Sequence, residues 1–274
     1  MTTSDGVLRM RGTTLGPGTP QVCVPIVAAT PEDAAAAARA LPDGAADVVE
    51  LRLDHLTGSA LDPALARAAV AAVRAALPAT VPLLATFRSA REGGAQPADD
   101  AAYAAVVDAV IDAVIDAGAD GAGTDAADVG GQTADAIDVE LATPGVAGLV
   151  SRARAAGLAV VVSHHDFAAT PPADEIVALL RRQRDVGADV CKVAVMPHDP
   201  DDVLALLTAT RAFARDADRP VVTVAMGALG VISRLAGGVF GSAMTFASAG
   251  AASAPGQVDV ERLRAALALL HDAR

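Results

Sequence analysis

The sequence is poor in aromatic residues and cysteine, and it lacks long apolar runs. Aromatic residues make up 2% of its 274 residues, with no tryptophan and one tyrosine. A core must therefore consist mainly of alanine, valine and leucine, which the 53% hydrophobic content can supply. The two cysteines, Cys23 and Cys191, cannot form a disulfide framework, so a reducing, cytoplasmic setting is expected. Because no uninterrupted apolar run reaches about 18 residues, no membrane span is expected.

Positive charge is scarce as well. The net charge is −12, whereas nucleic-acid binding needs a basic surface that neutralises phosphates, so no nucleic-acid partner is expected. The N-terminal Met-Thr-Thr-Ser-Asp lacks the basic and apolar regions of a signal peptide, so we expect no secretion signal.

Lysine is almost absent, and this gives the first indication of chemistry. Lys192 is the only lysine among 21 basic residues; all the others are arginine. Arginine serves equally well in surface ion pairs, but only a buried lysine can lose its proton and act as a nucleophile. The apolar neighbours Cys191 and Val193 make a charged amine costly to bury, which favours its neutral, reactive form. Chance retention of one lysine is the alternative interpretation.

From residue 21 onward, short segments rich in Val, Leu and Ile alternate with Ala-rich helical segments. The predicted strands are Val22–Ala28, Val48–Leu53, Leu83–Arg88, Ile137–Glu140, Ala159–Ser163, Val190–Val195, Val221–Met226 and Ser242–Phe246. The predicted helices are Pro31–Leu41, Pro63–Leu77, Asp99–Ala117, Pro144–Ala156, Pro172–Arg184, Asp201–Arg215, Leu229–Ala236 and Val260–His271. Thr30-Pro31 and Thr143-Pro144 mark two helix starts, because each places a capping residue before a first-turn proline.

This alternation predicts an α/β fold, a (β/α)₈ TIM barrel in a single domain spanning residues 1–274. Within residues 1–20, the segment Val7–Arg11 is predicted to form a short hairpin before the first barrel strand. An open doubly wound sheet is the structural alternative. Its dinucleotide-binding version is disfavoured, because no G-x-G-x-x-G follows the first strand.

Polar residues gather at the C-terminal ends of the predicted strands, where barrels of this type place their active sites. The candidates are Glu50, Arg52, Arg88, Glu140, His165 and Lys192. Glu50 and Arg52 are two residues apart, so they share one face of their strand. A structural ion pair between these two side chains is an open alternative.

Glu140 and His165 also have simpler interpretations. Glu140 ends the fourth predicted strand, where a surface carboxylate would be equally at home. His165 follows the fifth predicted strand, where it is either an ordinary loop histidine or a functional residue. The cluster His164-His165-Asp166 is a weak metal-site candidate, because adjacent histidines point apart and no further ligand lies at suitable spacing. We therefore predict no metal.

An anion-binding group follows the last two strands. Arg234 lies in a segment after the seventh strand, and loops at this position commonly hold anions in such barrels. A guanidinium can clamp a carboxylate or phosphate through two parallel hydrogen bonds. Ser253 and Gln257, after the eighth strand, add small polar donors beside it. An ordinary turn before the last helix is the alternative for this segment.

Taken together, these segments resemble the signature of the type I 3-dehydroquinate dehydratases, from Cys23 to the last helix. The matching segments are Glu50-Leu51-Arg52-Leu53-Asp54, Thr86-Phe87-Arg88-Ser89, Glu92-Gly93-Gly94, Ile137-Asp138-Val139-Glu140, Ser163-His164-His165-Asp166-Phe167, Lys192-Val193-Ala194-Val195-Met196-Pro197, Val231-Ile232-Ser233-Arg234-Leu235-Ala236-Gly237 and Ser253-Ala254-Pro255-Gly256-Gln257. Each segment alone is a weak signal, whereas all of them in this order are specific.

The resemblance implies a lyase that converts 3-dehydroquinate to 3-dehydroshikimate in the shikimate pathway of aromatic amino-acid biosynthesis. In that family Lys192 would form a Schiff base with the substrate ketone, and His165 would be the general acid/base of a syn elimination. Glu140 would orient His165. The resemblance gives the remaining polar residues to substrate binding, with the hydroxyls held by Glu50, Arg52 and Arg88 and the carboxylate by Arg234, Ser253 and Gln257. It also implies a homodimer and no cofactor.

Two other functions remain compatible with these residues. A class I aldolase-type barrel lyase would also form a Schiff base on a lysine of the sixth strand, but it would leave the carboxylate clamp at Arg234 less well explained. A non-catalytic barrel that binds a ligand is the other alternative, and the retention of Lys192 argues against it.

Overall fold

The computed structural model describes residues 6–57, 62–120, 133–250 and 253–271. Its main sheet has nine strands in the order β11-β10-β3-β4-β5-β6-β7-β8-β9, and every neighbouring pair is parallel. The strands are β3 (Gln21–Ile26), β4 (Val48–Arg52), β5 (Leu83–Thr86), β6 (Ala136–Glu140), β7 (Ala159–Asp166), β8 (Val190–Val195), β9 (Val221–Ala225), β10 (Met244–Ser248) and β11 (Val258–Asp259).

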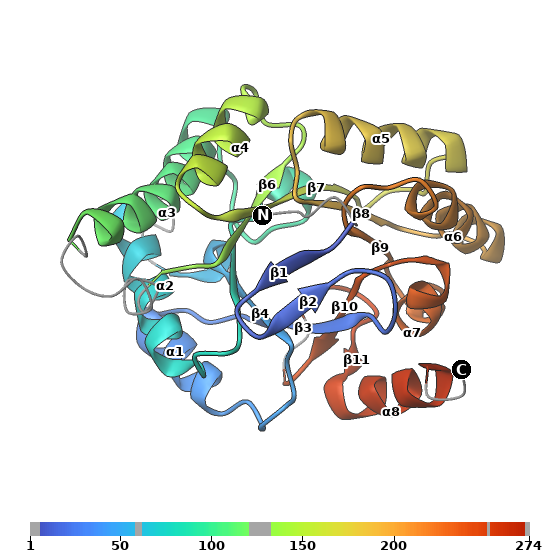
Figure 1. Ribbon diagram of the computed structural model, residues 1–274, viewed down its shortest axis with the longest axis horizontal. Coiled ribbons are helices and arrows are strands. Elements are labelled where there is room, and N and C mark those ends of the chain that lie inside the picture. The colour runs from blue at the N-terminus through green and yellow to red at the C-terminus, as the bar shows by residue number, and fades with distance from the viewer. Residues whose placement is uncertain (1–5, 58–61, 121–132, 251–252, 272–274) are drawn as a thin grey trace.

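The sheet curls until strands β9 and β10 meet, which makes it a barrel (Figure 1). A parallel bridge joins Val221 to Ser242, and the amide of Ala243 donates to the carbonyl of Val221 at 2.8 Å. The predicted TIM barrel is therefore confirmed. The short strand β11 is the one parallel strand of the described part that the sequence pattern did not predict.

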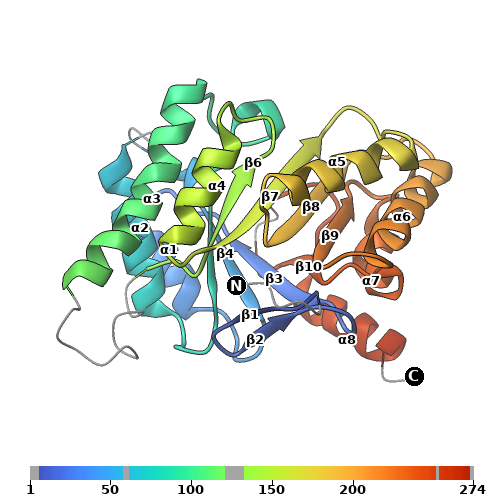
Figure 2. The same ribbon diagram turned by 45° about the horizontal axis from the view of Figure 1, so that its top comes forward.

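Helices surround the barrel in both views (Figures 1 and 2). They are α1 (Pro31–Arg39), α2 (Pro63–Ala76), α3 (Asp100–Asp120), α4 (Val146–Ala155), α5 (Ala173–Asp185), α6 (Pro200–Ala214), α7 (Val231–Phe240) and α8 (Val260–His271). The cap predicted at Thr30 is present, because its hydroxyl accepts the amide of Asp33 at 3.1 Å. The helix start predicted at Thr143-Pro144 is wrong: α4 begins at Val146, after Gly145 with a φ of 73°. None of the helices in the described ranges is long and apolar enough to cross a membrane.

Side chains alternate along the barrel strands between the inside of the barrel and its helix-covered outside. Those that point outward, such as Val49, Val139 and Cys191, pack with the helices in the larger core. Those that point inward at the strand starts, such as Cys23, Val48 and Val190, form a second core inside the barrel. Polar side chains replace the inward apolar ones toward the other end of the strands, and the site is built there.

The N-terminal segment closes the opposite end of the barrel. Strands β1 (Leu8–Met10) and β2 (Thr13–Leu15) form the predicted antiparallel hairpin. Leu8 and Leu15 are fully buried in the inner core, beside residues that begin the barrel strands. The hairpin crosses the mouth of the ring in Figure 1. Ligand access is therefore left to the carboxyl ends of the strands.

Candidate active site

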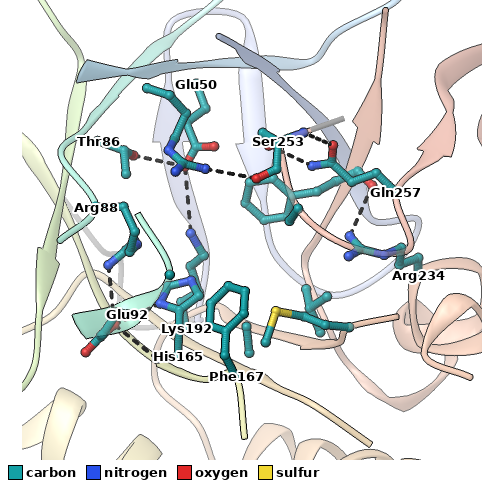
Figure 3. A pocket seen from close by; sticks show the side chains of 17 residues that line it. Glu50, Thr86, Arg88, Glu92, His165, Phe167, Lys192, Arg234, Ser253 and Gln257 are labelled. Carbon is teal, nitrogen blue, oxygen red and sulfur yellow. Dashed lines mark hydrogen bonds and ion pairs between the residues drawn. The ribbon is translucent and has the colours of Figure 1, made fainter. Parts of the chain in front are cut away.

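A cavity of about 540 Å³, including its open mouth, lies at the carboxyl ends of the barrel strands. The polar side chains that line it, most of them labelled in Figure 3, are Glu50, Arg52, Thr86, Arg88, Glu92, His165, Lys192, Arg234, Ser253 and Gln257. The structure thus brings every sequence-predicted site residue into one cavity except Glu140, which lies behind it.

Lys192 projects from the inner face of β8 and is 4% exposed. Its Nζ lies 3.1 Å from Oδ2 of Asp138 and 3.8 Å from Oε1 of Glu50, and it sits 4.8 Å from the centre of the Phe246 ring. We expected apolar surroundings for this amine. Only its neighbours along the strand, Cys191 and Val193, are apolar, and their side chains face the helices. The cavity side of Lys192 carries carboxylates instead, and these stabilise a positive charge on the nitrogen.

Asp138 occupies the floor of the site, with no exposed surface. Its Oδ1 accepts a hydrogen bond from Ser163 Oγ at 2.6 Å and forms an ion pair with Arg88 Nη2 at 2.8 Å. Although burial opposes ionisation, the charges of Arg88 and Lys192 hold the pKa of Asp138 at about 2. This carboxylate is therefore charged at neutral pH.

His165 lies near the end of β7, whose pairing with β8 continues to Asp166. We expected His165 to follow the strand. The strand is longer than predicted, because His165 pairs with Ala194 of β8. Glu92 Oε2 accepts its backbone amide at 3.0 Å and contacts its Nδ1 at 2.9 Å. When Oε2 accepts from Nδ1 as it does from the backbone amide, Nδ1 carries the ring proton and Nε2 is left as the base.

Burial keeps both members of this pair uncharged. It lowers the pKa of His165 well below its usual value, and Arg88 and Lys192 lower it further. Burial also raises the pKa of Glu92 to about 8, helped by Glu140 and Asp138. At neutral pH the site therefore holds a neutral imidazole beside a neutral carboxyl group, which costs less to bury than two charges.

Glu140 does not occupy the place that we expected. The resemblance implied that it orients His165, but the structure gives that hydrogen bond to Glu92. The carboxylate of Glu140 accepts bonds from the amide and hydroxyl of Ser89, both at 2.8 Å, and from Arg88 Nη1 at 3.1 Å. It therefore fixes the segment that leaves β5, which carries Arg88 and Glu92. The physical reason is that Glu92 lies in a short turn, Ala90–Glu92, that folds over the pocket toward His165.

Glu50 and Arg52 line the cavity from β4, but they do not form the structural ion pair held open as an alternative. Arg52 makes a two-pronged contact with Asp54 instead, at 2.8 and 2.7 Å. Glu50 Oε1 accepts the hydroxyl of Thr86 at 2.9 Å. Asp54 is fully buried and was not singled out from the sequence. It aims the guanidinium of Arg52 into the pocket.

Arg234 is a buried cation with no carboxylate partner in the described part of the chain. It is 2% exposed; Nη2 donates to the carbonyl of Pro255 at 3.0 Å, and Nε has no partner there. Burial alone lowers its pKa to about 10. Such a charge is costly unless an anion approaches it. The site therefore offers a place for a carboxylate, as the sequence predicted.

The loop after β10 closes this end of the pocket. Gln257 Oε1 accepts the amide of Ser253 at 2.8 Å, and its Nε2 donates to the Ser253 hydroxyl at 3.0 Å. Arg52 Nη1 reaches the carbonyl of Ser253 at 3.3 Å. The segment treated as a possible simple turn thus bridges the two arginine groups of the site (Figure 3).

Several residues of the site were missed by the sequence reasoning. Glu92, Asp138, Thr86, Phe167 and Phe246 all contribute to the site or its floor. For Asp138 a signal existed, because in Ile137-Asp138-Val139-Glu140 the two carboxylates alternate with apolar residues and so share the inner face. For the metal alternative at His164-His165-Asp166, no group of three or more potential ligands is found in the described residues.

The family model described as type I 3-dehydroquinase matches residues 22–274. A 3-dehydroquinate dehydratase of Klebsiella pneumoniae is 40% identical over 264 residues, covering 95% of this chain and 97% of that protein. The enzyme of the same name from Listeria monocytogenes is 42% identical, covering 96% and 97%.

Solved structures agree with this result. A type I 3-dehydroquinate dehydratase from Clostridium difficile, with covalently modified comenic acid, matches with a TM-score of 0.85 at 34% identity, covering 98% of this chain and 99% of that one. The 3-dehydroquinate dehydratase of Geobacillus kaustophilus matches with a TM-score of 0.85 at 32% identity, covering 99% of each chain.

Proposed function

Because the chain belongs to the type I 3-dehydroquinase family, we propose that it dehydrates 3-dehydroquinate to 3-dehydroshikimate through a Schiff base on Lys192. The observation that carries the proposal is that the only lysine of the chain lines the same cavity as a buried, neutral histidine. This activity would place the protein in the shikimate pathway of aromatic amino-acid biosynthesis.

The reaction begins with covalent attachment of the substrate. The ammonium group of Lys192 gives up a proton and the neutral amine attacks the ketone carbon. The resulting carbinolamine takes up one proton as it loses water, which leaves a protonated imine. Because the nitrogen is bonded to the substrate, it can accept the electron pair released when a neighbouring C–H bond breaks. This electron sink is the purpose of a Schiff base.

His165 is proposed to move the proton. Its Nε2 takes a proton from the carbon next to the imine, which converts the imine to an enamine. The enamine then expels the hydroxyl group, and His165 returns the proton so that water leaves on the same face. Hydrolysis of the new imine releases 3-dehydroshikimate and restores Lys192. Glu92, which holds Nδ1, sets the orientation of the imidazole for both transfers.

The remaining residues are proposed to hold the substrate. Glu50, Arg52 and Arg88 would bind its hydroxyl groups. Arg234, Ser253 and Gln257 would bind its carboxylate, since the buried charge of Arg234 has no anionic partner in the described part of the chain. No step calls for a metal or an organic cofactor. The carboxylate site favours this function over an aldolase-type cleavage, which leaves Arg234 without a role.

The proposed activity is tested directly by incubation with 3-dehydroquinate. The product contains a C=C bond conjugated to its carbonyl group, so ultraviolet absorbance should rise as it forms. An aldolase would break a C–C bond and produce no such chromophore. Absorbance that does not rise above the enzyme-free control would exclude the dehydratase.

From the resemblance and composition we further propose a cytoplasmic homodimer with no nucleic-acid or membrane partner. The excess of acidic over basic residues supports the absence of a nucleic-acid partner. Light scattering on the purified protein tests the dimer, and a monomeric mass would reject it.

Replacement of Arg234 by lysine is expected to weaken substrate binding even though the charge is kept. Lysine cannot form two parallel hydrogen bonds to a carboxylate, and each such bond is worth roughly 1.5–3 kcal/mol. We expect kcat/KM for 3-dehydroquinate to fall about 10- to 100-fold. An analogue that lacks the carboxylate should lose almost nothing, since it never used the guanidinium.

The matched control is Arg74→Lys. Arg74 is also a buried arginine, but it donates to the carbonyls of Leu77, Pro78 and Val81 outside the cavity. Its replacement should lower stability and affect both substrates equally. An equal loss on both substrates in Arg234→Lys would mean that Arg234 is structural.

Substitution of Gly256 by alanine should displace the loop that carries Ser253 and Gln257. Gly256 has a φ of 74°, and an added Cβ would lie 2.2 Å from the carbonyl oxygen of Gly227. The loop must therefore move, and we expect KM to rise about tenfold as the carboxylate contacts lengthen. Gly145→Ala is the control, because Gly145 has a φ of 73° but open space around its Cβ position. If both variants keep a normal KM, the loop does not hold the substrate.

A further inference from the structure

Beneath the cavity, Asp138 contacts the reacting nitrogen and has no role in the steps described above. It is 0% exposed, and its Oδ2 lies 3.1 Å from Nζ of Lys192. Its other oxygen is fixed by Ser163 and Arg88, at 2.6 and 2.8 Å. The hydrogen bond and the ion pair on this oxygen hold the carboxylate in its orientation when the nitrogen changes its bonding. The charge therefore stays in place throughout the reaction.

We propose that Asp138 is a further catalytic residue, the fixed counter-ion of the Lys192 nitrogen, which favours every state in which that nitrogen is positive. The proposal rests on the Schiff-base function above. Because the pKa of Asp138 is held at about 2, the carboxylate does not carry protons during the reaction. Its effect is purely electrostatic, and such effects are strong where water is excluded.

The counter-ion has opposite effects on different steps. Before the substrate binds, it favours the ammonium form of Lys192 and so opposes formation of the nucleophilic amine. After the imine forms, it keeps that nitrogen protonated and thus able to accept electrons. Formation of the enamine removes the positive charge from the nitrogen.

The loss of the hydroxyl group restores the positive charge. The enamine nitrogen pushes its electron pair toward carbon, the new C=C bond forms, and hydroxide leaves with the proton from His165 as water. The nitrogen is again a protonated imine, with its positive charge 3.1 Å from the position of Oδ2 in this structure. The carboxylate therefore stabilises both protonated imines relative to the enamine, whether the enamine goes on to product or returns to substrate.

Other charged or polarisable groups also face Lys192, and they must be considered in any pH measurement. They are Glu50 on β4, Arg88 after β5, His165 on β7, Cys23 on β3 and the Phe246 ring on β10. Glu50 is farther from Nζ than Asp138, at 3.8 against 3.1 Å. The proposal thus assigns the larger effect to Asp138.

Asp138→Asn tests the proposal, because it removes the charge with almost no change in shape. Borohydride trapping of substrate on Lys192 should reach half of its maximal rate at a pH lower by at least about one unit, since the ammonium form loses its counter-ion. In D₂O, the ratio of deuterium uptake by unreacted substrate to product formation should stay near its wild-type value, because both exits from the enamine restore the same positive charge on the nitrogen. A purely structural role would lower activity without shifting the trapping midpoint.

Ser163→Ala is the matched control, because it removes a hydrogen bond to Asp138 and keeps the charge. It should leave the trapping midpoint and the exchange ratio near wild-type values, whatever its rate. If Asp138→Asn does not fold, Asp138→Ser carries the same expectations. Wild-type protein that turns over without an adduct on Lys192 would reject the proposed function. An adduct in wild type, with an unchanged trapping midpoint in the Asp138 variant, would reject only the counter-ion.

Discussion

Replacement of Lys192 by arginine is expected to abolish turnover while leaving the barrel folded. Arginine keeps a positive charge beside Asp138 and Glu50, so no buried carboxylate loses its cation. It cannot lose its proton, however, and so cannot form an imine. Loss of a covalent nucleophile lowers turnover by roughly 10⁴- to 10⁶-fold.

Lys192→Met separates the chemical role from the structural one. It should be equally inactive, but it leaves the carboxylates of Asp138 and Glu50 without the lysine, and removal of one partner from a buried ion pair costs about 3–5 kcal/mol. Thermal unfolding should therefore show a lower Tm for the methionine variant than for the arginine variant. If the two variants unfold together, the buried ion pairs contribute little to stability.

The covalent intermediate gives the decisive measurement. Borohydride added during turnover should reduce the imine to a stable secondary amine, inactivate the wild-type enzyme, and add the substrate mass to the peptide that contains Lys192. Neither variant should gain this mass. Normal turnover with an unmodified Lys192 peptide would exclude the Schiff base.

The barrel was predictable from sequence because the signals of its strands and helices are local and follow one another along the chain. Buried parallel strands read as short apolar runs, and each is followed by a helix with its own start signal, as at Thr30-Pro31. The errors lie at the ends of elements. Strand β7 continues through His165 because β8 pairs with it, and no local signal reports that pairing.

The site was partly predictable for a similar reason. Lys192 stood out by composition, and Arg234 by its position after the seventh barrel strand. Glu92 did not stand out, because its role depends on the direction of a short turn. Two hydrogen bonds set that direction: the amide of Ser89 donates to Glu140, and the amide of Gly94 donates to the carbonyl of Ser89. Which carboxylate meets His165 is a property of the folded loop, and for this reason Glu140 was assigned a contact that Glu92 makes.

His165→Ala is expected to slow turnover by about 10²- to 10⁴-fold while leaving the Schiff base intact. The amine of Lys192 and the ketone can still combine, but no base removes the neighbouring proton and no acid assists the departing hydroxyl group. Substrate should therefore accumulate as the imine, and borohydride should still modify Lys192. This outcome distinguishes a lost acid/base from a lost nucleophile.

His164→Ala is the matched control at the neighbouring position. The side chain of His164 is 28% exposed and its Nδ1 lies 3.9 Å from Glu92 Oε1, whereas Nδ1 of His165 lies 2.9 Å from Oε2. We expect only a small change in kcat for His164→Ala. If His164→Ala proves crippling and His165→Ala mild, the two histidines have been assigned the wrong way round.

The pH dependence gives a second test of His165. Burial lowers its pKa well below the usual value of 6.5, so the basic, neutral imidazole persists as the pH falls through 6.5 and is lost only at lower pH. In single-turnover reactions that start from the preformed imine, the acidic limb of the rate profile should therefore lie below pH 6.5. The same experiment tests whether Glu92 orients the imidazole of His165. Glu92→Gln keeps a hydrogen-bond acceptor for Nδ1, so this variant should retain most of the rate that His165→Ala loses. A limb at or above pH 6.5 would mean that the imidazole is solvated during catalysis, and that the closed pair of Glu92 and His165 does not perform the proton transfer.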